Sequence, residues 1–218
     1  MKRRDFSRQG AAALAVSAFG LPALQAQAQA KKPEAGADYL VLDKPAPLEA
    51  PAGKVEVVEF FWYSCPHCNA FEPTLDAWVK RAPKDVVVRR VPVAFRDDFV
   101  PQQRLFYALE AMGLVDKLHG KVFNAVHLEK LALNKGELIA EWIAKQGVDK
   151  DKFMAQYNSF TVSTKSSKAA QLQNSYKVEG VPALGVAGRF YTDGTLSKNM
   201  ERGLQIVDFL VAEVRAGR

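Results

Sequence analysis

Residues Val55–Cys68 read VEVVEFFWYSCPHC, and this stretch decides the fold. Its first eight residues, Val55–Trp62, are nearly all apolar, β-branched or aromatic, which predicts a strand covered on both faces. A helical pattern follows, in which apolar side chains recur on one face of a helix. They are Phe71, Leu75, Trp78 and Val79. Pro66 suits the first helical position, so we expect Cys65 to cap this helix.

Further along the chain, the order of the apolar patterns predicts an α/β architecture. A second strand is expected at Val86–Phe95, so the first unit is strand, helix, strand. Residues 100–176 have a mostly helical pattern, and a short hairpin around Gly188 and a final amphipathic helix follow them. This order predicts a thioredoxin-like fold with an all-helical insertion between its βαβ and ββα halves.

We therefore divide the chain into four parts. They are a signal peptide (1–30), an N-terminal arm with a short edge strand at Tyr39–Leu42 (31–54), a thioredoxin-like domain (55–99 and 177–218) and a helical insertion (100–176). The first part has a basic start, an apolar stretch and small residues that end in Ala28 or Ala30, which is the layout of a cleaved secretory signal. The paired basic residues Arg3 and Arg4 leave the general secretory and twin-arginine export routes both open.

The net charge does not indicate a nucleic-acid partner. Half of the formal charge of +6 comes from residues 1–30, where four basic residues oppose Asp5. No run rich in lysine and arginine stands out in the remainder, so we expect no nucleic-acid binding. The mature chain is long enough to bury a substantial core without covalent cross-links.

The two cysteines, Cys65 and Cys68, read as a reactive pair. A disulfide between them closes a four-residue ring worth about 2 kcal/mol, against about 4.7 kcal/mol for a hundred-residue loop. Such a ring stabilises a fold only weakly. Because an exported chain meets an oxidising compartment, disulfide exchange is the better explanation of the pair. A closed zinc site needs four ligands, and neither His119 nor His127 has a matching spacing, so we expect no metal.

The position of Cys65 at a helix N-terminus favours its thiolate. Unpaired backbone N–H groups and the positive end of the helix dipole both stabilise a negative sulfur there. His67 is expected to add positive charge beside it, unless it is only a solvated turn residue. Cys68, one turn further in, is expected to be less exposed and to keep an ordinary pKa. Because a stabilised thiolate favours the reduced form, this arrangement predicts a pair that donates its disulfide.

The segment FFWYSCPHC at residues 60–68, together with Gly180-Val181-Pro182, resembles the DsbA family of periplasmic thiol:disulfide interchange proteins. The resemblance implies that Cys65 is the nucleophile, that Cys68 is its resolving partner, and that Pro66 and His67 complete the motif. It also implies a cis peptide bond before Pro182 and a backbone at Val181 that pairs with substrate. From the residues alone, an ordinary trans bond would be expected there.

Glu59 is the second notable residue, because a carboxyl group inside an apolar strand must be buried. The resemblance places it beneath the cysteines, where it can influence proton transfer; a plain buried ion pair is the alternative. Glu72 also matches an acid of the family, but the usual basic residue nearby is Arg90 here, and arginine does not release a proton usefully. Trp62 and Tyr63 either border a substrate groove or pack in the core, and the two histidines of the helical block are expected to be structural.

Together these features predict a periplasmic dithiol oxidase. It donates the Cys65–Cys68 disulfide to exported proteins with free cysteines, through a mixed disulfide at Cys65. The resemblance implies reoxidation by a DsbB-like, quinone-linked membrane oxidase, and no metal or organic cofactor. We expect a monomer. A disulfide isomerase of the DsbC kind would need an N-terminal dimerisation domain, for which residues 31–54 are too few. A disulfide reductase, a holdase and an oxidase with few substrates stay open.

Overall fold

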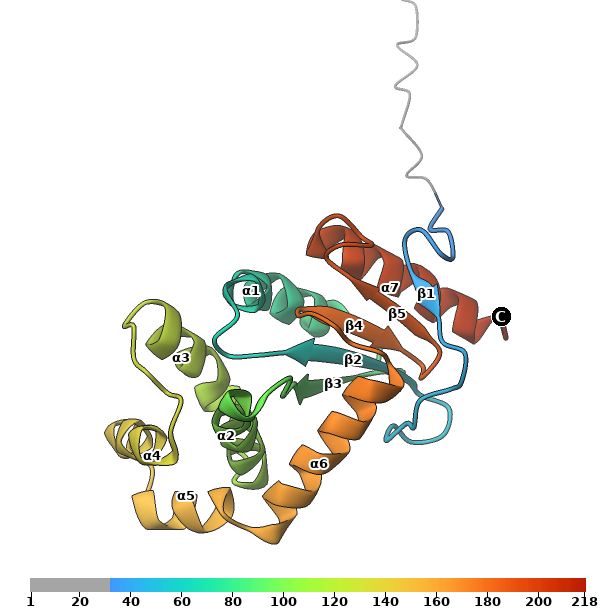
Figure 1. Ribbon diagram of the computed structural model, residues 1–218. Helices are drawn as coiled ribbons and strands as arrows, with labels where there is room; N and C mark the ends of the chain where they lie inside the picture. Colours follow the sequence, from blue (N-terminus) through green and yellow to red (C-terminus); the bar gives the residue numbers. More distant parts are fainter. Residues whose placement is uncertain (1–31) are drawn as a thin grey trace, which may run out of the picture. The chain divides into compact units, whose positions relative to one another are not determined.

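The computed structural model describes residues 32–218, so the predicted signal peptide lies outside the described residues (Figure 1). The chain forms a five-stranded sheet with helices on both of its faces. In chain order the elements are β1 (Leu40–Val41), β2 (Val55–Phe61), α1 (Pro66–Arg81), β3 (Val86–Pro92), the 3₁₀ turn η1 (Asp97–Phe99), α2 (Val100–Ala111), α3 (Val115–His127), α4 (Gly136–Lys145), α5 (Lys150–Tyr157), α6 (Phe160–Ser175), β4 (Ala183–Val186), β5 (Phe190–Asp193) and α7 (Met200–Arg215).

The strand order is β1-β5-β4-β2-β3, with β2 inside the sheet. β2 and β3 are parallel and are joined by α1, whereas β4 pairs with β2 and β5 pairs with β4 in antiparallel directions. The five helices α2–α6 lie in sequence between β3 and β4. The predicted fold class, a thioredoxin-like sheet with a helical insertion, is therefore confirmed. The domain boundaries given above stay predictions.

Every residue of β2 is buried, as its apolar sequence predicts. The pleat sends Val57 into a cluster with α1 and α7, while Val58 and Phe60 pack on the opposite face with the helical insertion. Figure 1 shows the same arrangement, with α1 and α7 on one side of the sheet and α2 and α6 on the other. The two glutamates of β2 are buried with their apolar neighbours, so each needs a polar partner within the protein.

The start of α1 follows the predicted pattern. Pro66 occupies its first turn and Cys65 is its N-cap, in an extended backbone conformation. The helix ends at Arg81, just before Ala82 and Pro83, where a proline disfavours continuation of the helix. This geometry places both cysteines at the end of β2, at the junction with the helical insertion.

The segment before β4 returns the chain to the cysteines. The Val181–Pro182 peptide bond is cis, as the family resemblance implied and as the residues alone did not. Gly185 in β4 lies against the ring of Tyr176, and a Cβ there would stand 2.3 Å from a ring carbon, so only glycine fits. The Tyr176 hydroxyl accepts a hydrogen bond from the N–H of Gly188 at 3.0 Å, which fixes the β4–β5 turn.

Within residues 32–218, no helix combines the length and the apolar character that a membrane crossing requires.

Candidate active site

The two cysteines lie side by side at the start of α1 and are free thiols in this structure. The Cys65 sulfur accepts a hydrogen bond from the backbone N–H of Cys68 at 3.3 Å. Cys65 keeps 7% of its surface exposed, whereas Cys68 is completely buried. An incoming thiolate can therefore reach the first sulfur and not the second.

The surroundings of the two sulfurs separate their acidities. The pKa of Cys65 is lowered to about 6, first by a hydrogen bond from the Cys68 thiol, then by backbone N–H groups, with a smaller contribution from the charge of His67. Burial raises the pKa of Cys68 far above its usual range, and the neighbouring Cys65 raises it further. The prediction of an ordinary pKa for Cys68 was wrong, because its complete burial removes the water that would solvate a thiolate.

The Val181–Pro182 segment lies directly against the exposed sulfur. The Cys65 thiol donates a hydrogen bond to the carbonyl oxygen of Val181 at 3.3 Å. Ionisation of Cys65 removes this bond and leaves the N–H of Cys68 directed at the sulfur. A cleft of about 530 Å³ adjoins the segment. Its walls include His67, Ala70, Phe71, Val181, Pro182 and Met200.

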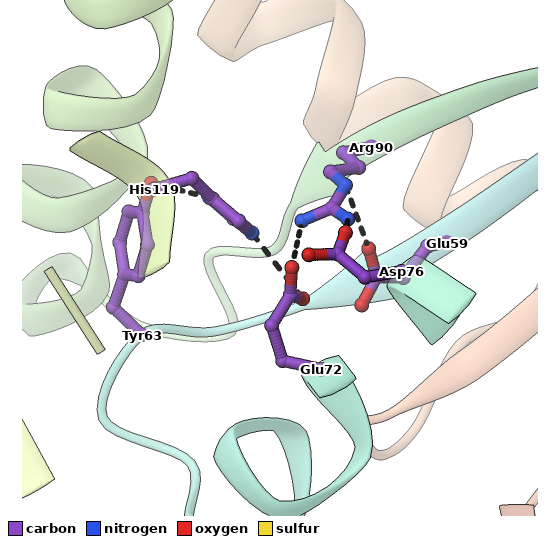
Figure 2. Close-up of polar contacts among 6 residues, drawn as sticks. All are labelled: Glu59, Tyr63, Glu72, Asp76, Arg90 and His119. Carbon is purple, nitrogen blue, oxygen red and sulfur yellow. Dashed lines mark hydrogen bonds and ion pairs between the residues drawn. The ribbon is translucent and has the colours of Figure 1, made fainter. Parts of the chain in front are cut away.

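Glu59 lies on β2 with its carboxyl group fully buried, and its register partner on β3 is Arg90. The Arg90 Nε is 3.7 Å from a carboxylate oxygen of Glu59, but neither oxygen has a hydrogen-bond partner among the described residues (Figure 2). Burial raises the pKa of Glu59 to about 8 despite the lowering effect of Arg90. Glu59 and Arg90 lie within ion-pair distance, as the alternative of a plain buried ion pair requires, and the role of Glu59 in proton transfer stays a prediction.

Arg90 contacts two further carboxylates, both on α1. Its Nη1 donates to Glu72 Oε1, and its Nη2 donates to Asp76 Oδ1 at 2.7 Å. Burial alone would raise the pKa of Glu72, but His119 and Arg90 together outweigh burial and lower it. The pKa of Glu72 is thus shifted down, whereas that of Glu59 is shifted up.

Sequence reasoning missed the contacts of the α3 histidines. Nδ1 of His119 lies 2.8 Å from the Tyr63 hydroxyl, and Nε2 of His127 lies 2.8 Å from the Tyr63 carbonyl oxygen. Tyr63 is buried, so it belongs to the core and not to a substrate groove. Trp62 is partly buried and stacks on Phe99 with ring centroids 3.9 Å apart. The contacts join residues 56 and 64 positions apart, and no local pattern signals them.

A glutamine that the sequence did not single out also anchors the active-site loop. The Gln102 side-chain oxygen on α2 accepts the backbone N–H of Ser64 at 3.1 Å, and its amide nitrogen donates to the Ser64 hydroxyl at 2.7 Å. Ser64 directly precedes Cys65, so the helical insertion holds the loop from a second side. Across residues 32–218, no group of three histidine, cysteine or acidic side chains is arranged to bind a metal ion.

Comparisons with known proteins agree with this geometry. A family model described as a DSBA-like thioredoxin domain matches residues 56–212. The thiol:disulfide interchange protein DsbA of Burkholderia cepacia is 46% identical over 197 residues, which cover 90% of this chain and 93% of the relative. DsbA of Bordetella parapertussis is 42% identical and covers 99% of this chain and 100% of the relative. The crystal structure of Pseudomonas aeruginosa DsbA superposes with a TM-score of 0.81 at 40% identity, covering 84% of this chain and 95% of that one.

Proposed function

The chain belongs to the DsbA family of thiol:disulfide oxidoreductases, and we propose that it is a dithiol oxidase of the periplasm. It donates the Cys65–Cys68 disulfide to newly exported proteins that carry free cysteines. The observation that carries this proposal is the position of the Cys65 sulfur at the N-terminus of α1, where it accepts the backbone N–H of Cys68 at 3.3 Å and where its pKa is lowered to about 6. Stabilising the thiolate stabilises the reduced enzyme, and a more stable reduced form makes the disulfide a stronger oxidant.

The reaction begins on the oxidised enzyme, with the disulfide as electrophile. A substrate thiolate attacks the Cys65 sulfur, the Cys65–Cys68 bond breaks, and Cys68 leaves as a thiolate that takes up a proton. A second substrate thiolate then attacks the substrate sulfur of the mixed disulfide and releases Cys65 as a thiolate. Two electrons pass from the substrate thiols to the enzyme, and the substrate gains one disulfide.

The difference in exposure between the two sulfurs decides the order of these reaction steps. Cys68 is inaccessible, so the mixed disulfide forms at Cys65. The low pKa of Cys65 makes it a good leaving group in the second step. The very high pKa of Cys68 means that its thiolate takes up a proton at once, and the negative charge of an ionised Glu59 raises that pKa further. We assign Glu59 a supporting role in this proton transfer.

The cleft beside Val181 and Pro182 is the proposed site for the substrate chain. Val181, whose carbonyl oxygen lies 3.3 Å from the Cys65 sulfur, lines this cleft, and so does His67. An extended substrate segment pairs with the Val181 backbone in the manner of an added strand, which aligns its cysteine without reading its sequence. Such backbone pairing suits an enzyme that acts on many unfolded chains.

Family membership supports the cellular setting that we propose. The predicted signal peptide directs the chain to the periplasm, where the mature protein acts as a monomer. A quinone-linked membrane oxidase of the DsbB kind returns the reduced pair to the disulfide. The protein needs no metal or organic cofactor, because the cysteine pair itself carries the two electrons.

Oxidation of a reduced, unfolded model protein tests the proposal. One equivalent of oxidised enzyme is expected to form one substrate disulfide, and Cys65→Ala and Cys68→Ala are expected to form none. A matched control is His127→Asn, which changes a contact of the loop but leaves both sulfurs in place. If Cys65→Ala retained full function in preventing aggregation and wild type formed no disulfides, the chain would be a holdase and the proposal would fail.

A further inference from the structure

His119 is buried on α3, with 4% of its surface exposed. Its Nδ1 is occupied by the Tyr63 hydroxyl, and three phenylalanine rings surround the imidazole. The other ring nitrogen, Nε2, makes no hydrogen bond to any described residue and lies 3.4 Å from Glu72 Oε2. Figure 2 shows the imidazole directed at that carboxylate. If the Tyr63 hydroxyl donates to Nδ1, the proton of the neutral ring is on Nε2 and faces Glu72.

The guanidinium of Arg90 is divided among three carboxylates. Nη1 binds Glu72, Nη2 binds Asp76 and Nε faces Glu59 at 3.7 Å. Arginine and carboxylate groups frequently pair through two parallel hydrogen bonds. Glu72 instead uses only Oε1 on Arg90, while its Oε2 lies against His119. The imidazole thus lies against Oε2, the oxygen that Glu72 would need for a second hydrogen bond from Arg90.

We propose that His119 is a positioning residue of the redox site: by engaging the second oxygen of Glu72, it leaves the Nε of Arg90 directed at Glu59. This inference rests on the proposed function only in that Glu59 acts on Cys68. Arg90, Glu72 and Asp76 shift the pKa of Glu59, and Glu59 also interacts electrostatically with Tyr63 and Cys68. The same three groups act on His119. His119 therefore reaches Glu59 through Glu72 and Arg90.

The contact between His119 and Glu72 is therefore expected to lower the pKa of Glu59. Without the imidazole, Glu72 is expected to take a second hydrogen bond from Arg90 and draw positive charge away from Glu59. The anionic form of Glu59 then loses stabilisation, so its pKa rises. Removing the charge of Glu72 has the opposite effect, because it removes both a competitor for Arg90 and a like charge, so the pKa of Glu59 falls.

Titration of the carboxyl carbons by ¹³C NMR in the reduced full-length mature protein tests the proposal, with Glu59→Gln identifying the signal. We expect His119→Leu to raise the ionisation pH of Glu59 by about half a unit or more, and Glu72→Gln to lower it by a similar amount. His119→Gln keeps an N–H donor and is expected to shift it less than leucine does. His127→Asn, on the same helix but directed at the Tyr63 carbonyl, is the matched control and is expected to leave it unchanged.

A purely structural histidine would lower the melting temperature without moving this titration. An unchanged Glu59 titration in folded His119→Leu, or a shift of the same sign in Glu72→Gln, would overturn the proposal. If His119→Leu does not fold, Tyr63→Phe is a second test, because it removes the hydroxyl that occupies Nδ1 of His119. We expect it to raise the ionisation pH of Glu59 by less than His119→Leu does. An unchanged ionisation pH in Tyr63→Phe would also overturn the proposal. The titration is independent of disulfide donation, so either proposal can fail alone.

Discussion

Acidification is expected to destabilise the reduced form relative to the oxidised form, because the thiolate of Cys65 is lost. Its pKa of about 6 in the folded protein lies below the value of about 8.5 for an unperturbed cysteine. A lowered pKa contributes stability that is fully present above the unfolded value and is lost as the pH falls through the folded value. The window therefore runs from about pH 8.5 down to below pH 6. The oxidised form has no thiol at this position and lacks the effect.

The magnitude follows from these two values. Ionisation of Cys65 stabilises the folded, reduced protein by about 2.5 kcal/mol at pH 8 and by less than about 0.1 kcal/mol at pH 5. Since Cys65 keeps part of its surface exposed, solvent screening reduces the expected difference to about 1.5–2 kcal/mol. The four-residue ring of the oxidised form contributes about 2 kcal/mol in the other direction. This second contribution does not vary with pH, so it leaves the difference between the two pH values intact.

Denaturant unfolding of the reduced and the oxidised protein at pH 5 and pH 8 measures this effect. Groups that titrate in the same way in both forms cancel when the free energy of unfolding of one form is subtracted from that of the other. Repeating the measurements in Glu59→Gln removes the other group of the site that titrates near pH 8. If the reduced-minus-oxidised difference were equal at the two pH values, the stabilised thiolate at Cys65 would be refuted.

Three further outcomes are expected. Gly185→Ala places a Cβ against the ring of Tyr176 and should lower the free energy of unfolding by about 1–3 kcal/mol in denaturant titrations; an unchanged midpoint would contradict the close packing. Glu56→Gln weakens the two backbone N–H bonds at 2.8 Å that tie the arm to β2 and should cost about 1–2 kcal/mol in the same assay, whereas a neutral change would mean that the arm is held elsewhere. Iodoacetamide should label Cys65 with a midpoint near pH 6 and leave Cys68 unmodified in the folded protein, as mass spectrometry of the digested protein will reveal; labelling of both would contradict the burial of the second sulfur.

The strand, the helix and the cap at Cys65 were predictable because each depends on neighbouring residues. Apolar periodicity indicates β2 and α1, and a proline just inside a helix indicates where α1 begins. The order of these elements was enough to predict the fold class. The low pKa of Cys65 followed in the same way, since the Cys68 thiol and the backbone N–H groups that stabilise its thiolate belong to the next residues of the chain.

Other features depend on contacts between distant parts of the chain. The cis bond before Pro182 was expected only through the family resemblance, because the dipeptide itself favours trans. The extent to which burial raises the pKa of Cys68 depends on helices packed from the insertion. The position of His119 against Glu72 joins α3 to α1, and neither helix carries a pattern that predicts it. Such contacts decide how the site is tuned, whereas local patterns decide where it lies.

The redox equilibrium of the purified protein with reduced and oxidised glutathione at pH 7 tests the central claim most directly. If folding favours the open pair with Cys65 ionised, modest concentrations of reduced glutathione will convert the protein fully to the dithiol. A protein that kept its disulfide under strongly reducing glutathione ratios would show the opposite preference, and a role as a disulfide donor would be excluded.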